Sequence, residues 1–200
     1  MRIAAVLLAA GLGSRFDPTG ESDKLLAPWL DGKPVLWHSA SRVLAAVDEV
    51  IAVIRPGQDQ RRECLERLGI RVVSSGAARL GMGAALSDGI AALAGADGAL
   101  VCLGDMPAVS GQTLIRVRDA ITDARAIVAP RFNGTPGHPV GFGAHWFDEL
   151  RALDADRGPR HLLTRHEVSW LTVDDPGCRL DVDHPADLAM QASAINPRRV

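Results

Sequence analysis

The 200-residue sequence lacks a strong excess of charge of either sign, has few cysteines and contains no long apolar run. Lys and Arg total 22 against 24 Asp and Glu, which gives a net charge of −2. A protein that binds the nucleic-acid backbone usually carries a strong basic excess, so we expect no nucleic-acid partner. No segment reaches the roughly 18 apolar residues that a membrane-spanning helix needs, so we expect no membrane partner either.

The three cysteines, Cys64, Cys102 and Cys178, are odd in number and widely spaced. They fit neither a disulfide framework nor a zinc site, which predicts reduced thiols and a cytoplasmic location. The apolar start of the chain, residues 1–10, superficially resembles a signal peptide. It continues into residues 11–15 (Gly-Leu-Gly-Ser-Arg) without a cleavage-like site, so a buried first strand explains it better.

Short apolar runs rich in β-branched residues alternate along the chain with longer segments of helical period. This order predicts an α/β fold: a Rossmann-like three-layer αβα arrangement with a mostly parallel sheet and helices on both faces. The expected strands are Ile3–Leu8, Val50–Ile54, Arg71–Ser74, Ala99–Leu103, Ile127–Ala129 and Val168–Val173. The expected helices are Val35–Val47, Gln58–Leu68, Ala84–Leu93, one that begins after Ser110, Ala144–Leu153 and Pro185–Ser193.

Ser110 is the expected N-cap of its helix, with Val109 and Leu114 placed for a hydrophobic staple. The alternation weakens over Arg131–Gly143, which is rich in Gly and Pro. We find no internal repeat, low-complexity tract or linker. We therefore expect a single domain over residues 1–200, with a frayed tail at residues 195–200.

Ligands of open parallel sheets bind beyond the carboxyl ends of the strands. That rule selects four segments: Ala9–Arg15, Ser74–Gly76, Gly104–Pro107 and Asp181–Pro185. The same segments carry most of the residues suited to phosphate or metal chemistry. The coincidence predicts one site at the carboxyl edge of the sheet.

The glycine loop, residues 8–15, follows the first strand directly and reads Leu-Ala-Ala-Gly-Leu-Gly-Ser-Arg. Small residues and glycines let the backbone approach phosphate oxygens, to which free N–H groups can donate. Phe16 stands where a dinucleotide-binding loop has its third glycine, and the Gly-Lys-Ser/Thr ending of a P-loop is missing. Taken alone, the loop is equally compatible with an ordinary strand-to-helix turn.

Two cations follow the glycines. Arg15 closes the loop, and Lys24 lies further along, beyond a polar segment at residues 17–23 that is a candidate lid. Fixed positive charge suits a triphosphate and the charge that develops on departing pyrophosphate. The alternative is that both are solvated surface cations.

Two carboxylates complete the candidate site. Asp105 ends a buried strand, where it is placed to hold Mg²⁺ opposite the glycine loop; a turn or a helix cap is the alternative role. Asp183 lies just before the helix that Pro185 starts, and its alternative role is to complement the helix N-terminus.

In their order along the chain, these motifs resemble the NTP-transferase superfamily, and within it the molybdenum cofactor nucleotidyltransferases. The matching motifs are Leu-Ala-Ala-Gly-x-Gly-x-Arg, Lys-Leu-Leu-Ala-Pro from Lys24, Gly-Lys-Pro-Val-Leu from Gly32, Gly-Asp-Met-Pro from Gly104 and Asp-Val-Asp-x-Pro from Asp181. The resemblance implies a fold of the nucleotide-diphospho-sugar transferase type. It also implies an enzyme that transfers a nucleoside monophosphate from an NTP to a phosphorylated acceptor and releases pyrophosphate.

The resemblance further assigns roles to individual residues. Arg15, Lys24 and Asp105 would be catalytic, and Asp105 and Asp183 would hold Mg²⁺. The acceptor would contact His138, in a Gly-His-Pro-Val stretch, and Arg160, in a segment at 156–163 that matches a family motif. A satisfied loop histidine and a surface ion pair are the alternatives. The nucleotide-binding residues would be Leu8, Ala9, Ala10, Gly11, Gly13, Ser14, Arg15, Lys24, Ser75, Gly76, Gly81, Met82 and Gly104.

Leu-Ala-Ala-Gly resembles the cytidylyl-transferring members, so CTP and molybdopterin are the expected substrates, with a recipient molybdoenzyme or its chaperone as a further partner. Guanylyl transfer and a sugar phosphate or isoprenoid-precursor phosphate acceptor stay open. A nucleotide-binding regulator or chaperone that releases no pyrophosphate is the non-enzymatic alternative. An NAD(P)-binding redox protein is disfavoured, because Phe16 replaces the third glycine and Arg55 follows the second strand where an acid is expected.

Overall fold

Eight strands form one mixed sheet in the computed structural model, which describes residues 1–154 and 158–195. The strand order is β3-β2-β1-β4-β7-β5-β6, and β8, which lies off this path, also pairs with β5. Strands β1 to β4 are mutually parallel, β7 is antiparallel to both β4 and β5, and β8 is parallel to β5. The expected mostly parallel sheet is confirmed. The strands are β1 (Ile3–Leu8), β2 (Val50–Ile54), β3 (Arg71–Ser74), β4 (Gly98–Leu103), β5 (Ile127–Phe132), β6 (Thr135–Pro136), β7 (Val140–Gly143) and β8 (Ser169–Thr172).

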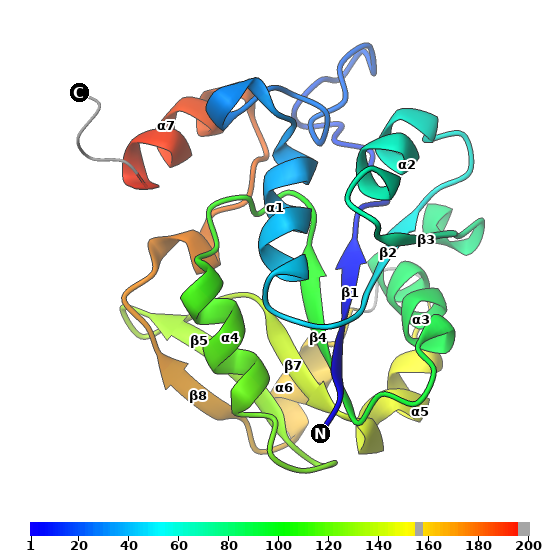
Figure 1. The fold of residues 1–200 in the computed structure, drawn as a ribbon, viewed down its shortest axis with the longest axis vertical. Coiled ribbons are helices and arrows are strands. Elements are labelled where there is room, and N and C mark those ends of the chain that lie inside the picture. The colour runs from blue at the N-terminus through cyan, green and yellow to red at the C-terminus, as the bar shows by residue number, and fades with distance from the viewer. Residues whose placement is uncertain (155–157, 196–200) are drawn as a thin grey trace.

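Helices cover both faces of this sheet, as expected (Figure 1). One face packs against α1 (Val35–Leu44), α2 (Asp59–Glu66) and α4 (Gly111–Asp119). The other packs against α3 (Met82–Ala92), α5 (Phe147–Arg151) and α6 (Arg160–Arg165). The last helix, α7 (Pro185–Ile195), lies at the edge of the sheet where β1 and β4 end. None of the described helices combines the length and the apolar character that a membrane-spanning helix requires.

Strand β1 is buried on both sides, which explains its continuous apolar sequence. Ile3, Ala5 and Leu7 pack toward α1, α2 and α4, whereas the alternate residues Val6 and Leu8 pack toward α3, α5 and α6. Fully burying a Leu or Val side chain stabilises the fold by roughly 1.5–3 kcal/mol. The first strand is therefore a firm anchor for the glycine loop that follows it.

The segment Arg131–Gly143, which the sequence left without a regular element, is part of the sheet. β5 continues to Phe132, the chain turns at Asn133 and Gly134, and β6 and β7 follow. A Cβ added to Gly141 would lie 2.8 Å from Cδ1 of Ile121. The glycines of β7 thus permit close packing against the neighbouring elements rather than marking a loop.

Several expected boundaries are also wrong by a few residues. The helix expected over Ala144–Leu153 is a 3-10 turn, Ala144–Trp146, followed by the short α5. The last helix reaches Ile195, where the frayed tail was expected to begin; residues 196–200 of that tail lie outside the described residues. The helices expected over Val35–Val47 and Gln58–Leu68 are shorter, the one expected over Ala84–Leu93 begins earlier, at Met82, and the strand expected over Ile127–Ala129 is longer.

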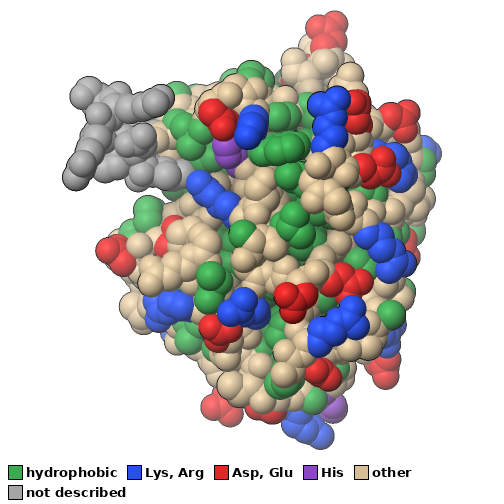
Figure 2. All heavy atoms as spheres, in the orientation of Figure 1, with side chains coloured by type: hydrophobic (Ala, Val, Ile, Leu, Met, Phe, Trp, Pro, Cys, Tyr) green, Lys and Arg blue, Asp and Glu red, His purple; other side chains and the backbone are tan. Residues whose placement is uncertain are grey.

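The predicted N-cap of α4 is confirmed, since Ser110 Oγ accepts a hydrogen bond from Thr113 N at 3.1 Å. Val109 and Leu114, the expected staple pair, are both buried in the cluster on this face. On the face shown in Figure 2, Lys and Arg side chains lie among acidic and apolar ones and form no continuous basic surface. This mixed surface agrees with the near-neutral composition.

We predict that Gly89→Ala destabilises the protein. Gly89 lies in α3, and a Cβ there would lie 3.0 Å from Cγ2 of Val53 and still closer to Val6. Overpacking of this kind costs about 1–3 kcal/mol, which exceeds the gain of about 1 kcal/mol from the better helix propensity of alanine. Urea unfolding measures the change. Gly111→Ala is the matched control, because no heavy atom lies within 4 Å of a Cβ at this helical glycine; equal stabilities of the two variants would contradict the prediction.

Candidate functional site

The glycine loop presents a row of backbone N–H groups at the carboxyl end of β1. Ala9 N continues the sheet by donating to Val53 O at 2.9 Å. In the part of the chain that the structure describes, no backbone N–H of residues 10–15 has a hydrogen-bond acceptor. Gly13 has a φ of +70°, and a Cβ there would lie 3.1 Å from Cγ of Lys24. Successive free N–H groups in such a turn form a concave site for an anion.

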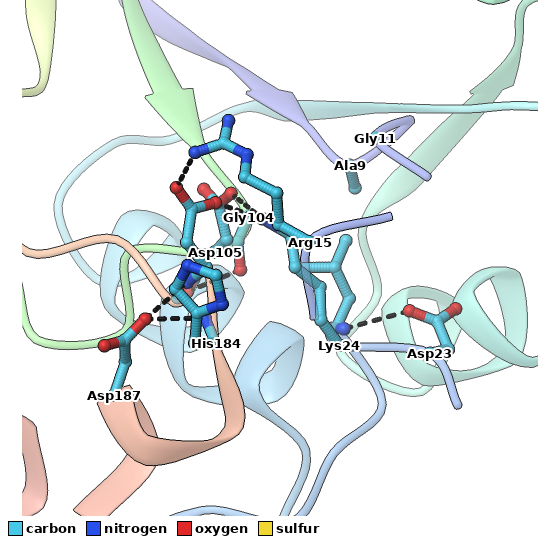
Figure 3. Close-up of polar contacts among 12 residues, drawn as sticks. Ala9, Gly11, Arg15, Asp23, Lys24, Gly104, Asp105, His184 and Asp187 are labelled. Carbon is cyan, nitrogen blue, oxygen red and sulfur yellow. Dashed lines mark hydrogen bonds and ion pairs between the residues drawn. The ribbon is translucent and has the colours of Figure 1, made fainter. Parts of the chain in front are cut away.

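Lys24 brings the predicted charged residues together (Figure 3). Its side chain is buried, and its Nζ lies 2.6 Å from Asp105 Oδ2 and 3.5 Å from Asp183 Oδ1. Arg15, whose side chain is mostly exposed, forms an ion pair with Asp183 through Nη1. The glycine loop, Lys24 and the two carboxylates thus converge at one edge of the sheet, as the sequence predicted.

Two side chains of α1 hold the backbone on either side of Asp105. Asp105 follows β4, and the carbonyl oxygen of the preceding Gly104 accepts a hydrogen bond from Ser39 Oγ at 2.9 Å. Arg42, also on α1, donates to the carbonyl oxygen of Pro107 through Nη1. The sequence prediction missed both α1 residues. The only signal in the sequence is their position, three residues apart on the apolar side of a helix.

Asp183 is fixed by two further contacts. Val182 N donates to the carbonyl oxygen of Asp105 at 2.9 Å, which ties the two acidic segments together. The carboxylate of Asp187, in the first turn of α7, accepts from Asp183 N at 2.9 Å and His184 N at 2.6 Å. Asp187 therefore holds the backbone of Asp183 and His184 at the start of α7.

The segment between β3 and α3 reaches the same edge of the sheet. Gly81 has a φ of +146°, which favours glycine, and Met82 at the start of α3 is half exposed. Gly76 is exposed as well. Ser75, by contrast, is buried, and its hydroxyl accepts from Ala78 N at 2.9 Å. Gly76 and Met82 are thus exposed and Gly81 is partly exposed, whereas the Ser75 side chain holds the turn.

The charges of Asp105 and Arg160 both act on the imidazole of His138, one of the two predicted acceptor residues. Burial lowers the pKa of His138, the carboxylate of Asp105 raises it, and the guanidinium of Arg160 lowers it. Arg160 is exposed at the start of α6. His138 lines a small cavity with Leu103 and Met106, which flank Asp105, whereas Arg160 lines a different hollow with Glu149 and His161. Asp156 and Arg157, which precede Arg160 in the family-like motif, lie outside the described residues.

Asp105 and Asp183 carry the carboxylate oxygens that a divalent cation prefers as ligands, and in this structure the Lys24 ammonium lies against both. Both carboxylates face a single point, since each has an oxygen within 3.5 Å of the same Lys24 ammonium. The described residues contain no group of three or more His, Cys, Asp or Glu side chains suited to a metal. Mg²⁺ is usually held by one or two carboxylates together with substrate phosphates and water. The nearby Asp181 has a raised pKa, chiefly because of burial, with the Asp183 and Asp105 charges as smaller causes.

Residues 5–170 match the MobA-like NTP transferase domain. The chain belongs to this family. This NTP transferase domain is also similar to bifunctional protein GlmU of Rhizorhabdus wittichii, with 34% identity over 146 residues that cover 70% of this chain and 30% of that protein. The chain thus spans about a third of the length of the curated relatives it matches.

Solved structures of similar proteins have the same fold. Rv0371c of Mycobacterium tuberculosis H37Rv is 30% identical with a TM-score of 0.83, and the match covers 96% of this chain and 98% of that one. A second structure of that protein is a complex with manganese, with a TM-score of 0.80, 30% identity and 97% and 100% coverage. A nucleotidyl transferase from Methanothermobacter thermautotroptrophicus is 27% identical, with a TM-score of 0.83 and 98% coverage of both chains. The nucleotide-diphospho-sugar transferase type of fold is confirmed.

We predict that two charge changes move the pKa of His138 in opposite directions. Asp105→Asn removes a negative charge and lowers this pKa further, whereas Arg160→Gln removes a positive charge and raises it. In the wild-type protein the pKa lies below the ordinary value of 6.5, so the unfolded chain binds this proton more readily and His138 destabilises the fold as pH falls through that range. A pH titration of the imidazole signals by NMR measures the shifts. If His138 titrates identically in both variants, the charges of Asp105 and Arg160 do not act on this imidazole.

Proposed function

We propose that this chain transfers a nucleoside monophosphate, most favourably CMP from CTP, to the phosphate of molybdopterin and releases pyrophosphate, with Mg²⁺ as the cofactor. One observation carries the proposal: the free N–H groups of the glycine loop, the buried Lys24 and the carboxylates of Asp105 and Asp183 meet at one edge of the sheet. The membership of the MobA-like NTP transferase family supports it.

The nucleotide half of the reaction needs donors for a triphosphate. N–H groups of the glycine loop would donate to phosphate oxygens, and Arg15 and Lys24 lie beside the loop to stabilise the charge on the departing pyrophosphate. An oxygen of the acceptor phosphate forms the new bond to the α-phosphorus. The bond from that phosphorus to the oxygen that bridges it to the β-phosphorus breaks, and its electron pair leaves with pyrophosphate.

The acceptor phosphate is already anionic near neutral pH, so the reaction needs no strong general base. Catalysis then consists of holding the two reactants in line and neutralising charge. Asp105 and Asp183 would hold the Mg²⁺, which when bound neutralises negative charge on the phosphates. The manganese complex of the mycobacterial relative supports a divalent cation in this fold.

Arg160 and His138 would contact the acceptor. Arg160 offers an exposed cation at the start of α6, and His138 carries an imidazole nitrogen, Nδ1, that has no hydrogen-bond partner among the described residues. The preference for CTP rests on the Leu-Ala-Ala-Gly sequence at the end of β1, and that for molybdopterin on the resemblance of the ordered motifs. The recipient of the product would be a molybdoenzyme or its chaperone.

A pyrophosphate-release assay tests the proposal. Each of the four NTPs is combined with Mg²⁺ and with molybdopterin, several sugar phosphates or an isoprenoid-precursor phosphate. The expected result is release with CTP and molybdopterin. Release with GTP, or with another acceptor, would change the assigned substrate but not the type of reaction. NTP binding without pyrophosphate in any combination supports a nucleotide-binding regulator or chaperone instead.

We predict that Asp105→Asn lowers the rate of pyrophosphate release by at least about 100-fold, the typical effect of losing one group that stabilises transition-state charge. The amide keeps the shape of the side chain but loses the charge that faces Lys24 and the proposed cation. Circular dichroism checks that the variant is folded. Asp148→Asn is the matched control, because its carboxylate is almost fully exposed and pairs only with Arg151 among the described residues. Normal turnover by Asp105→Asn would defeat the assignment.

A further inference from the structure

Arg61 is a buried arginine that no motif of the sequence singled out. It lies on α2, its exposed fraction is 2%, and its guanidinium contacts both ends of the segment from the glycine loop to Lys24. Nε and Nη2 donate to the two carboxylate oxygens of Asp23 at 2.6 and 2.7 Å. Nη1 donates to the carbonyl oxygens of Ala9 at 2.6 Å and Gly11 at 2.9 Å. Four hydrogen bonds thus converge on one rigid group.

The two carbonyl contacts determine where the loop N–H groups point. In a planar trans peptide the C=O and N–H bonds point in opposite directions. Because the carbonyl groups of Ala9 and Gly11 point at Arg61, the N–H groups of Ala10 and Leu12 point away from it. These are two of the N–H groups that have no acceptor among the described residues. Arg61 therefore holds the glycine loop in the conformation that presents donors to an anion.

The contact with Asp23 fixes the position of Lys24. Asp23 Oδ1 also accepts a hydrogen bond from Leu25 N at 2.9 Å, so the backbone on both sides of Lys24 is held by one carboxylate. The intervening loop is closed separately, since the Asp17 carboxylate accepts from Thr19 N and Ser22 N. Arg61 of α2 thus sets the distance between the loop N–H donors and the Lys24 ammonium.

We propose that Arg61 is a positioning residue that sets the N–H groups of the glycine loop against Lys24 and thereby determines the affinity of this site for a polyphosphate. The inference rests on the proposed function for its biological meaning. Its physical content, anion binding, is independent of nucleotidyl transfer. Lysine at this position keeps the charge but not the planar fork, so it cannot satisfy the four acceptors together.

The test measures binding of inorganic tripolyphosphate to the full chain by isothermal titration calorimetry, without nucleotide or acceptor. We expect Arg61→Lys to weaken binding by at least about tenfold, because losing even one charge-assisted hydrogen bond that orients the loop donors costs about that factor in an equilibrium constant. Asp23→Asn, which keeps the side-chain shape, should weaken binding in the same direction. Arg67→Lys is the matched control: it lies just after the same helix, 70% of its side chain is exposed and it pairs with Glu63 on the surface. It should bind as the wild type does.

The thermal midpoint of each variant is measured beside its affinity. A lower midpoint with tripolyphosphate affinity within twofold of the wild type would show a merely structural role and overturn the proposal. If Arg61→Lys does not fold, Asp23→Asn decides by the same criterion. Wild-type protein that binds no tripolyphosphate also overturns it. Tripolyphosphate binding that depends on Arg61, in a protein that releases no pyrophosphate with any NTP, would reject the proposed function and leave this inference standing.

Discussion

The burial of the Lys24 ammonium is the constraint on which the rest of the site depends. A buried charge costs several kcal/mol unless an opposite charge and hydrogen bonds compensate it. Here Asp105, 2.6 Å from Nζ, and Asp183, 3.5 Å from it, supply that compensation. Three segments that are far apart in the sequence must therefore meet before the charge is stable. Removing one carboxylate leaves the ammonium partly unpaired, so substitutions here affect the stability of the fold as well as its chemistry.

The sequence predicted this convergence because it follows from the direction of the strands. β1 and β4 are adjacent and parallel, so the residues after Leu8 and after Leu103 must emerge at the same edge. The burial of both strands is visible in their unbroken apolar sequences. The segment that carries Asp183 was selected by the same rule, although no strand ends directly before it. The structure supplies the reason why it reaches this edge, in the hydrogen bond from Val182 N to the carbonyl of Asp105.

What the sequence did not predict depends on contacts between distant residues. Arg61 lies in a helix of charged residues and has the local sequence of a solvated surface arginine, but it is buried because the glycine loop and Asp23 lie above it. The strand β7 was missed because its glycines suggested a loop. A larger residue at Gly141 would clash with Ile121, so packing within the fold requires this glycine. In both cases the local sequence is misleading, since a neighbour far along the chain determines the environment.

The charges of the site also explain how a chain with a net charge of −2 can offer a place for a polyanion. Arg15 and Lys24 are both engaged with carboxylates, so the two cations and the pair Asp105 and Asp183 sum to zero. Net charge therefore contributes little to attracting a triphosphate. The backbone N–H groups of the glycine loop must supply the recognition, and their strength depends on orientation rather than on the number of charges. This is the physical basis of the role proposed for Arg61, a buried guanidinium that acts on anion binding by orienting the loop carbonyl groups.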